Sequence, residues 1–151
     1  MQNRTFYNEI LTEHNLHPTH KHPLIQPSAS LRGVNPSCGD DITLQLKMAD
    51  DGSIEDGAFV GDGCAISQAS ADMMLDLVIG RTPEEALALK DTFMKMIKEK
   101  VSEEELELLE EASALQDISH MPARVKCAVL GWRTLEQILE KGDGEVTTEN
   151  E

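Results

Sequence analysis

Apolar and polar residues alternate most regularly in the stretch between residues 42 and 48. The apolar positions in this stretch are Ile42, Leu44, Leu46 and Met48. Strict alternation is typical of a strand with one buried face, so we expect a strand here. The turn sequence ADDGS separates it from a second apolar stretch at residues 54–61, and the two should pair as an antiparallel hairpin. The shorter stretch SLRGV, just upstream, predicts a third strand.

Helical spacing of apolar residues dominates the rest of the chain. It predicts helices at residues 4–14, in the segment between GDG and Gly80, at residues 91–118 and at residues 125–139. The sequence TPEEALAL adds a helix start, with threonine as the cap, proline at the first helical position and acids in the first turn. Within SEEELELLEEAS, the first serine and the glutamate three residues later fit a capping box.

The order of these elements is a helix, then strands, then several helices. This order predicts an α+β fold in which a small antiparallel three-stranded sheet packs against several helices. With 151 residues, the chain is most simply one domain over residues 1–151, large enough to bury a core without staples. The last residues, 141–151, are expected to form a disordered tail.

The charge of the chain argues against two classes of partner. The formal net charge is -15 at pH 7, so nucleic acids and anionic membranes would repel the protein. No stretch approaches the roughly 20 apolar residues that span a bilayer, and the amino-terminal sequence is too polar for a signal peptide. We therefore expect a cytoplasmic protein. In that reducing compartment, three cysteines suggest metal or sulfur chemistry, and plain buried thiols are the alternative.

The three cysteines stand at the ends of predicted elements, where a fold can gather distant residues into one site. Cys38 lies in the turn NPSCGDDI before a strand, Cys64 at a strand–helix junction, and Cys127 in the first turn of the last helix. A thiol at a helix amino terminus has a lowered pKa, which favours the thiolate that binds metal. Arg124 and Lys126 add positive charge beside Cys127.

Three thiolates need a fourth ligand to complete the tetrahedron that zinc prefers. Asp40 follows Cys38 across a single glycine, so both side chains can reach one ion. Asp41 is the competing candidate, although it leads into the strand and would equally face solvent. No C-x-x-C pair is present, so no common zinc-finger pattern applies. A Cys/Asp donor set indicates a site that is not purely structural.

A second group of candidate ligands is formed by histidines near the amino terminus. His14 precedes the segment NLHPTHKHPL, which holds three more histidines among prolines. These side chains are metal ligands in many proteins. Their irregular spacing favours a solvated loop over a metal site.

Three stretches resemble the U-type (IscU/NifU-like) family of iron–sulfur cluster assembly proteins. They are NPSCGDDITLQL, DGCAISQASADMM and MPARVKCAVLGWRTLE, and the resemblance covers roughly residues 4 to 140. The cluster-scaffold branch has a histidine immediately before the third cysteine, where this chain has Lys126. Together with the long segment between Cys64 and Cys127, this departure resembles the SufU-type branch, which is found with the SUF system.

This resemblance implies a SufE/NifU-like sandwich and a zinc ion held by Cys38, Asp40, Cys64 and Cys127. It further implies a sulfurtransferase-like sulfur acceptor that stimulates a cysteine desulfurase of the SUF system, an enzyme that uses pyridoxal phosphate (PLP). In the family the first motif cysteine takes up the persulfide sulfur, which corresponds to Cys38. Downstream cluster assembly proteins are the further partners that the resemblance implies.

Arg124, in the PARVKC motif, is implied to help dock the desulfurase, and an ordinary surface residue at a helix start is the alternative. Two other functions remain open at this stage. One is a scaffold on which an iron–sulfur cluster is assembled from the same ligands and passed to apo-proteins. The other is a purely structural zinc module that binds a partner.

Overall fold

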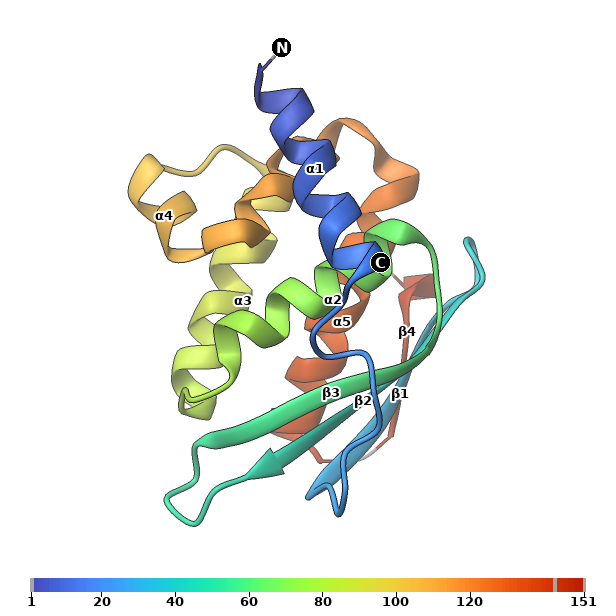
Figure 1. The fold of residues 1–151 in the computed structure, drawn as a ribbon, viewed down its shortest axis with the longest axis vertical. Helices are drawn as coiled ribbons and strands as arrows, with labels where there is room; N and C mark the ends of the chain where they lie inside the picture. The colour runs from blue at the N-terminus through green and yellow to red at the C-terminus, as the bar shows by residue number, and fades with distance from the viewer. Residues whose placement is uncertain (1, 143, 151) are drawn as a thin grey trace.

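The computed structural model describes residues 2–142 and 144–150, with side chains described for residues 9–142 and 144–149. Strands and helices follow the order that the sequence predicts, with additional elements near the carboxyl end (Figure 1). The elements are α1 (Gln2–Leu16), β1 (Ala29–Asn35), β2 (Asp40–Met48), β3 (Ile54–Asp62), α2 (Ala65–Val78), α3 (Pro83–Lys98), α4 (Glu103–Leu108), the 3₁₀ helix η1 (Glu110–His120), α5 (Pro122–Glu140), β4 (Glu145–Thr147) and the 3₁₀ turn η2 (Thr148–Asn150).

The sheet has four strands in the order β3-β2-β1-β4, and the helices pack on one side of it (Figure 1). β1, β2 and β3 pair antiparallel as predicted, whereas β4 pairs parallel with β1. The prediction of three antiparallel strands is therefore corrected to a mixed four-stranded sheet. The extra strand comes from the segment that the sequence predicts as a disordered tail. Its three residues, between glycines and acids, are too few to show a strand pattern in the sequence.

The alternation in β2 is confirmed by burial. Ile42, Leu44 and Leu46 are fully buried, while the intervening polar residues are half-buried or exposed. These apolar side chains pack under α2 and α5 in one continuous core. Within it, the rings of Phe93 from α3 and Trp132 from α5 stack with their centroids 4.9 Å apart. Aromatic residues are few in the chain, and both members of this pair are fully buried.

The helix starts agree with local sequence signals, but the single helix predicted at residues 91–118 is divided into three helical segments. Thr82 and Ser102 both form capping boxes, each with the glutamate three residues later. The second box begins a new helix, so α3 ends before it. Glu110 then takes a positive φ of 49°, which ends α4, and the chain continues as the 3₁₀ helix η1.

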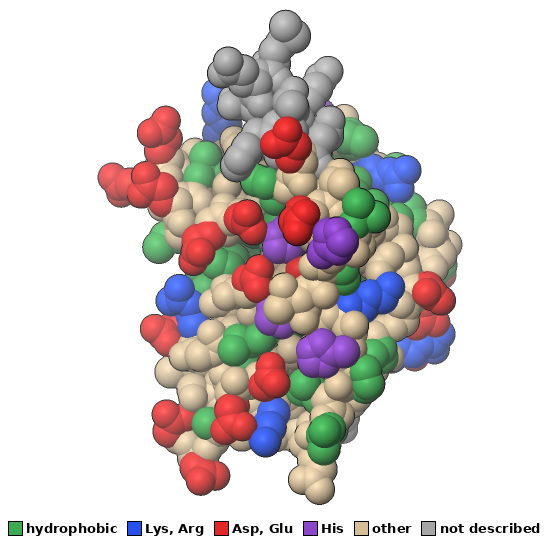
Figure 2. All heavy atoms as spheres, viewed as in Figure 1, with side chains coloured by type: hydrophobic (Ala, Val, Ile, Leu, Met, Phe, Trp, Pro, Cys, Tyr) green, Lys and Arg blue, Asp and Glu red, His purple; other side chains and the backbone are tan. Residues whose placement is uncertain are grey.

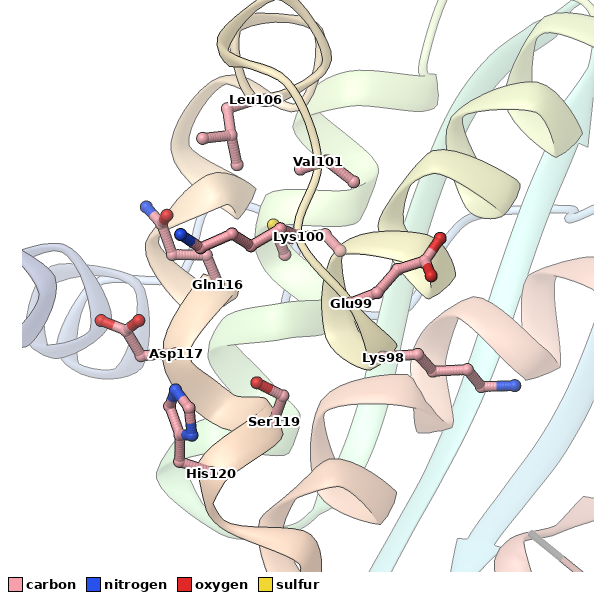
Figure 3. A pocket seen from close by; sticks show the side chains of 10 residues that line it. Lys98, Glu99, Lys100, Val101, Leu106, Gln116, Asp117, Ser119 and His120 are labelled. Carbon is pink, nitrogen blue, oxygen red and sulfur yellow. The ribbon is translucent and has the colours of Figure 1, made fainter.

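A hollow of about 460 Å³ lies between the end of α3, the loop after it and η1 (Figure 3). Lys98, Lys100, Gln116 and His120 are among its lining residues. Glu99 and Asp117 also line it, so the hollow carries mixed charge. None of its lining residues is one of the cysteines or Asp40, which shows that this hollow is separate from the predicted site.

Acidic side chains are spread widely over the face shown in Figure 2, and basic side chains are fewer there. This distribution agrees with the net charge of -15. Within the part of the chain that the structure describes, the helices are too short or too polar to cross a membrane.

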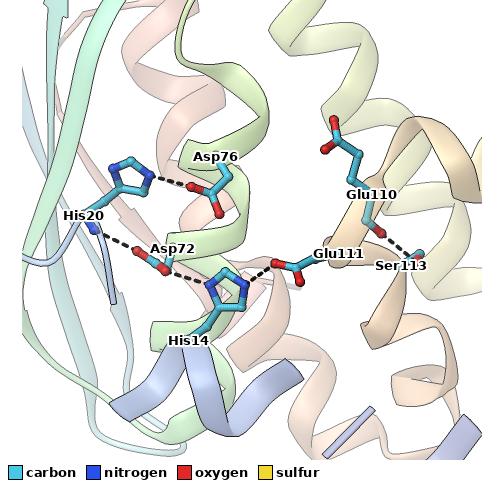
Figure 4. A network of polar contacts seen from close by, with 7 residues as sticks. All are labelled: His14, His20, Asp72, Asp76, Glu110, Glu111 and Ser113. Carbon is cyan, nitrogen blue, oxygen red and sulfur yellow. Dashed lines mark hydrogen bonds and ion pairs between the residues drawn. The ribbon is translucent and has the colours of Figure 1, made fainter. Parts of the chain in front are cut away.

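α2 is buried on nearly every side, which places a charged residue, Asp72, inside the protein. His14 of α1 compensates for this burial: its Nδ1 lies 2.7 Å from Oδ2 of Asp72 (Figure 4). The other ring nitrogen, Nε2, lies 2.7 Å from Oε1 of Glu111 in η1. His14 lies in α1, as the predicted helix at residues 4–14 requires, and it is only 8% exposed, so it belongs to the packed interior.

These contacts predict a pH-dependent contribution of His14 to stability. The hydrogen bond to Asp72, opposed by burial and helped by Glu111, raises the pKa of His14 to about 9. A raised pKa stabilises the fold fully below the ordinary value of 6.5, and this contribution is lost as the pH rises through about 9. Allowing for the exposure of Glu111, we expect a loss of about 2 kcal/mol in the free energy of unfolding.

Urea unfolding in a buffer with a metal chelator, repeated across this pH range, measures the loss. The variant His14→Gln serves as the control, because the other titrating groups remain in place. Asp72, Glu111 and Asp76 are the acidic groups that surround His14. An equal slope of stability against pH in the variant and the native protein would contradict the assignment to His14.

Candidate functional site

Cys38 lies in the tight turn between β1 and β2. The paired strands end with Asn35 opposite Asp40, so residues 36–39 form the connection. Gly39 takes a φ of 73°, a left-handed conformation that glycine adopts without strain. The N–H of Cys38 donates to the carbonyl of Asn35 at 3.3 Å, and its side chain is half-buried. The turn therefore presents Cys38 at the end of the sheet, where it is partly accessible.

Asp40 is only 2% exposed and is surrounded by hydrogen-bond donors. Its Oδ1 accepts from the N–H of Cys64 at 2.7 Å and from Oγ of Ser67 at 3.1 Å, and its Oδ2 accepts from Nδ2 of Asn35 at 2.9 Å. Burial alone would raise the pKa of Asp40. Hydrogen bonds from Cys64, Asn35, Cys127 and Ser67 outweigh burial and lower it, so the carboxylate is ionised at neutral pH.

Cys64 is the N-cap residue of α2, as its position after GDG predicts. Its Sγ accepts from the N–H of Ser67 at 3.4 Å. The preceding residue, Gly63, lets the backbone approach Asp40 closely. A Cβ at position 63 would lie 2.4 Å from Oγ of Ser67 and 3.0 Å from Oδ1 of Asp40. The start of α2 is therefore fitted to the carboxylate of Asp40.

Cys127 lies deeper than the sequence predicts. α5 begins at Pro122, so Cys127 is in the second turn of the helix and fully buried. Burial, followed by hydrogen bonds with Cys38 and Cys64 and by the charges of Cys64 and Asp40, raises its pKa. The predicted lowering of this pKa is therefore wrong. The free N–H groups that lower a thiol pKa lie in the first turn, which Cys127 has passed.

The structure brings the donor atoms of Cys38, Asp40 and Cys127 within 4.8 Å of one another. The Sγ atoms of Cys38 and Cys127 are 3.2 Å apart, and all three cysteines are free thiols. The sulfur of Cys64 is not part of that group, although the backbone N–H of Cys64 donates directly to Asp40. Two thiols and an ionised carboxylate, with a third thiol adjacent, match the donor set and charge that suit a tetrahedral zinc ion.

Two charged residues beside the site differ in the direction they face. Arg124 is exposed, and contact with Cys127, together with the charges of Cys64 and Cys38, raises its pKa. Its guanidinium therefore lies beside the thiols and is reachable from solvent. Asp41 instead pairs with Arg32, its Oδ2 lying 2.6 Å from Nη2. Adjacent residues of a strand point to opposite faces, so Asp41 points away from the donor group.

Sequence reasoning missed the residues that hold Asp40 in place. Asn35 donates to both Asp40 and Sγ of Cys127, the latter at 3.4 Å. Thr148 in turn donates to Oδ1 of Asn35 at 2.7 Å. Asn35 and Ser67 lie inside the motifs that carry the cysteines, and a polar residue next to a candidate ligand is a signal that could have identified them. Thr148 lies in the carboxyl-terminal tail and gives no such signal.

Comparison with known proteins identifies the family. The model of the NifU-like N terminal domain matches residues 6–146. The iron–sulfur cluster assembly scaffold protein IscU of Streptococcus pyogenes serotype M1 is 39% identical, over 89% of this chain and 83% of that protein. The zinc-dependent sulfurtransferase SufU of Bacillus subtilis (strain 168) is 37% identical, over 93% of each chain.

A solved structure from Fervidobacterium islandicum AW-1 has the same fold. It is described as an iron–sulfur cluster assembly scaffold protein for the SUF system (FiSufU), and it superimposes with a TM-score of 0.78 at 32% sequence identity. The superposition covers 91% of this chain and 98% of that one. Because the family model and these relatives span nearly the whole chain, the protein belongs to the family of NifU-like N-terminal domains, the U-type family that its cysteine motifs indicate.

Proposed function

We propose that this protein is a zinc-dependent sulfur acceptor in iron–sulfur cluster assembly. It takes persulfide sulfur from a PLP-dependent cysteine desulfurase of the SUF type and passes it to later assembly proteins. The observation that carries the proposal is the convergence of Cys38, Asp40 and Cys127, with Cys64 adjacent. The similarity to SufU of Bacillus subtilis, which is named a zinc-dependent sulfurtransferase, supports the same function.

Accessibility and position in the fold support Cys38 as the acceptor among the clustered thiols. Cys127 is fully buried, and its raised pKa keeps it protonated in the metal-free protein. Cys38 is half-buried in a turn at the end of the sheet, where a partner can reach it. Cys64 is also half-buried, but its sulfur is the cap of α2 and accepts a backbone hydrogen bond. The position of Cys38 in the turn between β1 and β2, outside any helix, supports it as the acceptor.

Sulfur transfer requires no oxidant or reductant. The Cys38 thiolate attacks the outer sulfur of the persulfide on the desulfurase cysteine, and a new S–S bond forms. The S–S bond inside the donor persulfide breaks, and the desulfurase cysteine leaves as a thiolate. The transferred sulfur keeps its oxidation state, so Cys38 ends as a persulfide and the donor as a free thiolate. Arg124, exposed beside the thiols, supplies positive charge where the anionic donor must approach.

Cys38, Asp40, Cys64 and Cys127 would hold the zinc ion, which keeps bound cysteines as thiolates and protects them from oxidation. Asp40 suits this role because its hydrogen bonds keep it ionised although it is buried. Those same bonds orient the carboxylate next to Cys38 and Cys127.

A scaffold for an iron–sulfur cluster is the second candidate function. The relative from Streptococcus pyogenes, named a scaffold protein, is as similar to this chain as SufU is. Thiolates and a carboxylate also suit a cluster. Lys126, next to Cys127, favours sulfur transfer, because a lysine is no ligand for iron whereas the histidine of the scaffold branch is.

Metal analysis combined with a desulfurase assay tests the choice. We expect a colourless protein that retains about one tightly bound zinc per chain. We also expect desulfurase turnover to rise several-fold when the protein is added. Iron and sulfide in a brown protein, with no change in turnover, would support the scaffold instead. Tight zinc without any effect on turnover would support a purely structural module.

A further inference from the structure

A second cluster of metal-ligating side chains lies where α1, α2 and η1 meet (Figure 4). One imidazole nitrogen of His14 and carboxylate oxygens of Asp76 and Glu111 all lie within 4.8 Å of one another. Asp76 stands twelve residues after Cys64, which is about 18 Å along α2. The cluster is therefore separate from the cysteine site and is not involved in the proposed sulfur transfer.

We propose that His14, Asp76 and Glu111 form a second binding site, for a divalent transition-metal ion such as Zn²⁺. Imidazole and carboxylate are both zinc ligands, with bonds of about 2.0 to 2.2 Å. Tetrahedral ligands at those distances lie about 3.3 Å from one another, which the spacing of the three donors allows. Three protein ligands leave one position for water.

Two further residues orient the ligands in the way that metal sites require. Asp72 holds Nδ1 of His14 at 2.7 Å, which directs Nε2 towards Glu111. Nε2 of His20 forms a hydrogen bond with Oδ1 of Asp76, also at 2.7 Å. The backbone N–H of His20 donates to Oδ1 of Asp72 at 2.8 Å. A carboxylate behind a ligating histidine and a hydrogen bond on a ligating carboxylate are the usual supports of a metal ligand.

The exposure of the three side chains allows an ion to reach the cluster. The side chain of His14 is buried and fixed, whereas the side chains of Glu111 and Asp76 are 60% and 46% exposed. The hydrogen bond between His14 and Glu111 measures 2.7 Å, so the two atoms need to separate by only about 0.6 Å to admit zinc. The exposed glutamate can make that movement without a change in the core.

Charge at the cluster also suits a cation. Asp72, Asp76 and Glu111 bring three carboxylates to His14 and His20, and a bound ion takes the place of the proton between His14 and Glu111. Figure 2 shows histidine side chains gathered among acidic ones on this face of the protein. Two ligating carboxylates neutralise a divalent ion, and the imidazole prefers transition metals over Ca²⁺ or Mg²⁺. The ion would tie α1 to α2 and η1.

The test is a titration of Zn²⁺ into the full-length protein whose cysteine site already holds zinc. We expect a second equivalent to bind, with at least about a tenfold loss of affinity in Glu111→Gln. Glutamine keeps an oxygen that accepts from His14 but removes the charge, and the position is exposed, so the fold should persist. Glu110→Gln is the matched control, because Figure 4 shows that side chain directed away from His14.

Replacement of zinc by Co²⁺ separates the two sites, since thiolate charge-transfer absorption marks the cysteine site and is absent from a nitrogen and oxygen site. The second equivalent should add no such absorption. Asp76→Asn should weaken the binding of the second equivalent as Glu111→Gln does. The proposal is overturned if the native protein takes up no second equivalent, or if Glu111→Gln and Glu110→Gln bind it equally well.

Discussion

Replacing Cys38 with alanine is expected to abolish the uptake of persulfide sulfur from a cysteine desulfurase, lowering its rate by at least about a thousandfold. The reason is that the proposed acceptor thiolate forms the new S–S bond, and we expect neither of the other cysteines to replace it. Cys127 is fully buried, and Cys64 is fixed as the cap of α2. Transfer of labelled sulfur in a single turnover, followed by mass spectrometry of the acceptor, measures this loss.

Cys64→Ala is the matched control for that experiment. Both variants remove a proposed zinc ligand, so both are expected to lose tightly bound metal. Only Cys64→Ala keeps the acceptor, so the labelled sulfur that it still takes up, at a rate lowered by the loss of zinc, should map to the peptide that contains Cys38. Sulfur uptake at the normal rate by Cys38→Ala, or labelling that maps to Cys64 in the native protein, would exclude the assigned role.

The strands and helix starts could be predicted from the sequence because their signals are local. The alternation in β2 and the capping boxes of α3 and α4 each lie within a few residues. β4 was missed because its pairing with β1, and the hydrogen bond from the adjacent Thr148 to Asn35, both depend on residues that are distant in sequence. The change to a 3₁₀ helix at η1 begins with a positive φ at Glu110, which is uncommon for a residue other than glycine and has no signal in the sequence.

The members of the candidate site were accessible to sequence reasoning, but their electrostatics were not. Spacing and element ends indicate which residues can meet, and the structure brings Cys38, Asp40 and Cys127 together. The pKa of Cys127 depends on how far the residue lies from the start of α5. The predicted start was three residues too late, so the pKa was expected to fall whereas the structure raises it. The burial of His14 could not be predicted either, since its partner Asp72 is buried in a helix with no unusual local sequence.

Replacing Asp40 with alanine is expected to lower zinc affinity by at least about a hundredfold, while Asp41→Ala leaves it unchanged. Asp40 faces the thiols inside the protein, and its neighbour Asp41 pairs with Arg32 on the outer face. A competition titration with a chromophoric chelator measures both affinities. Because the two variants remove the same charge from adjacent positions, any difference between them reports which way the side chain points.

The same pair of variants separates metal binding from stability. In the metal-free protein, Asp40→Ala leaves the N–H of Cys64 without its acceptor and the amide of Asn35 with only the weak acceptor Sγ of Cys127, which should lower the free energy of unfolding by about 2 to 3 kcal/mol. The lowered pKa of Asp40 also predicts how this stabilisation depends on pH. The contribution of Asp40 to the free energy of unfolding is present above the ordinary carboxyl pKa and is lost as the pH falls through the pKa in the folded protein. Asp41→Ala should leave stability nearly unchanged, because its ion pair is exposed. Retention of zinc by Asp40→Ala, or an equal loss in Asp41→Ala, would show that the carboxylate at position 40 is not a ligand and serves only to hold Cys64 and Asn35 in place.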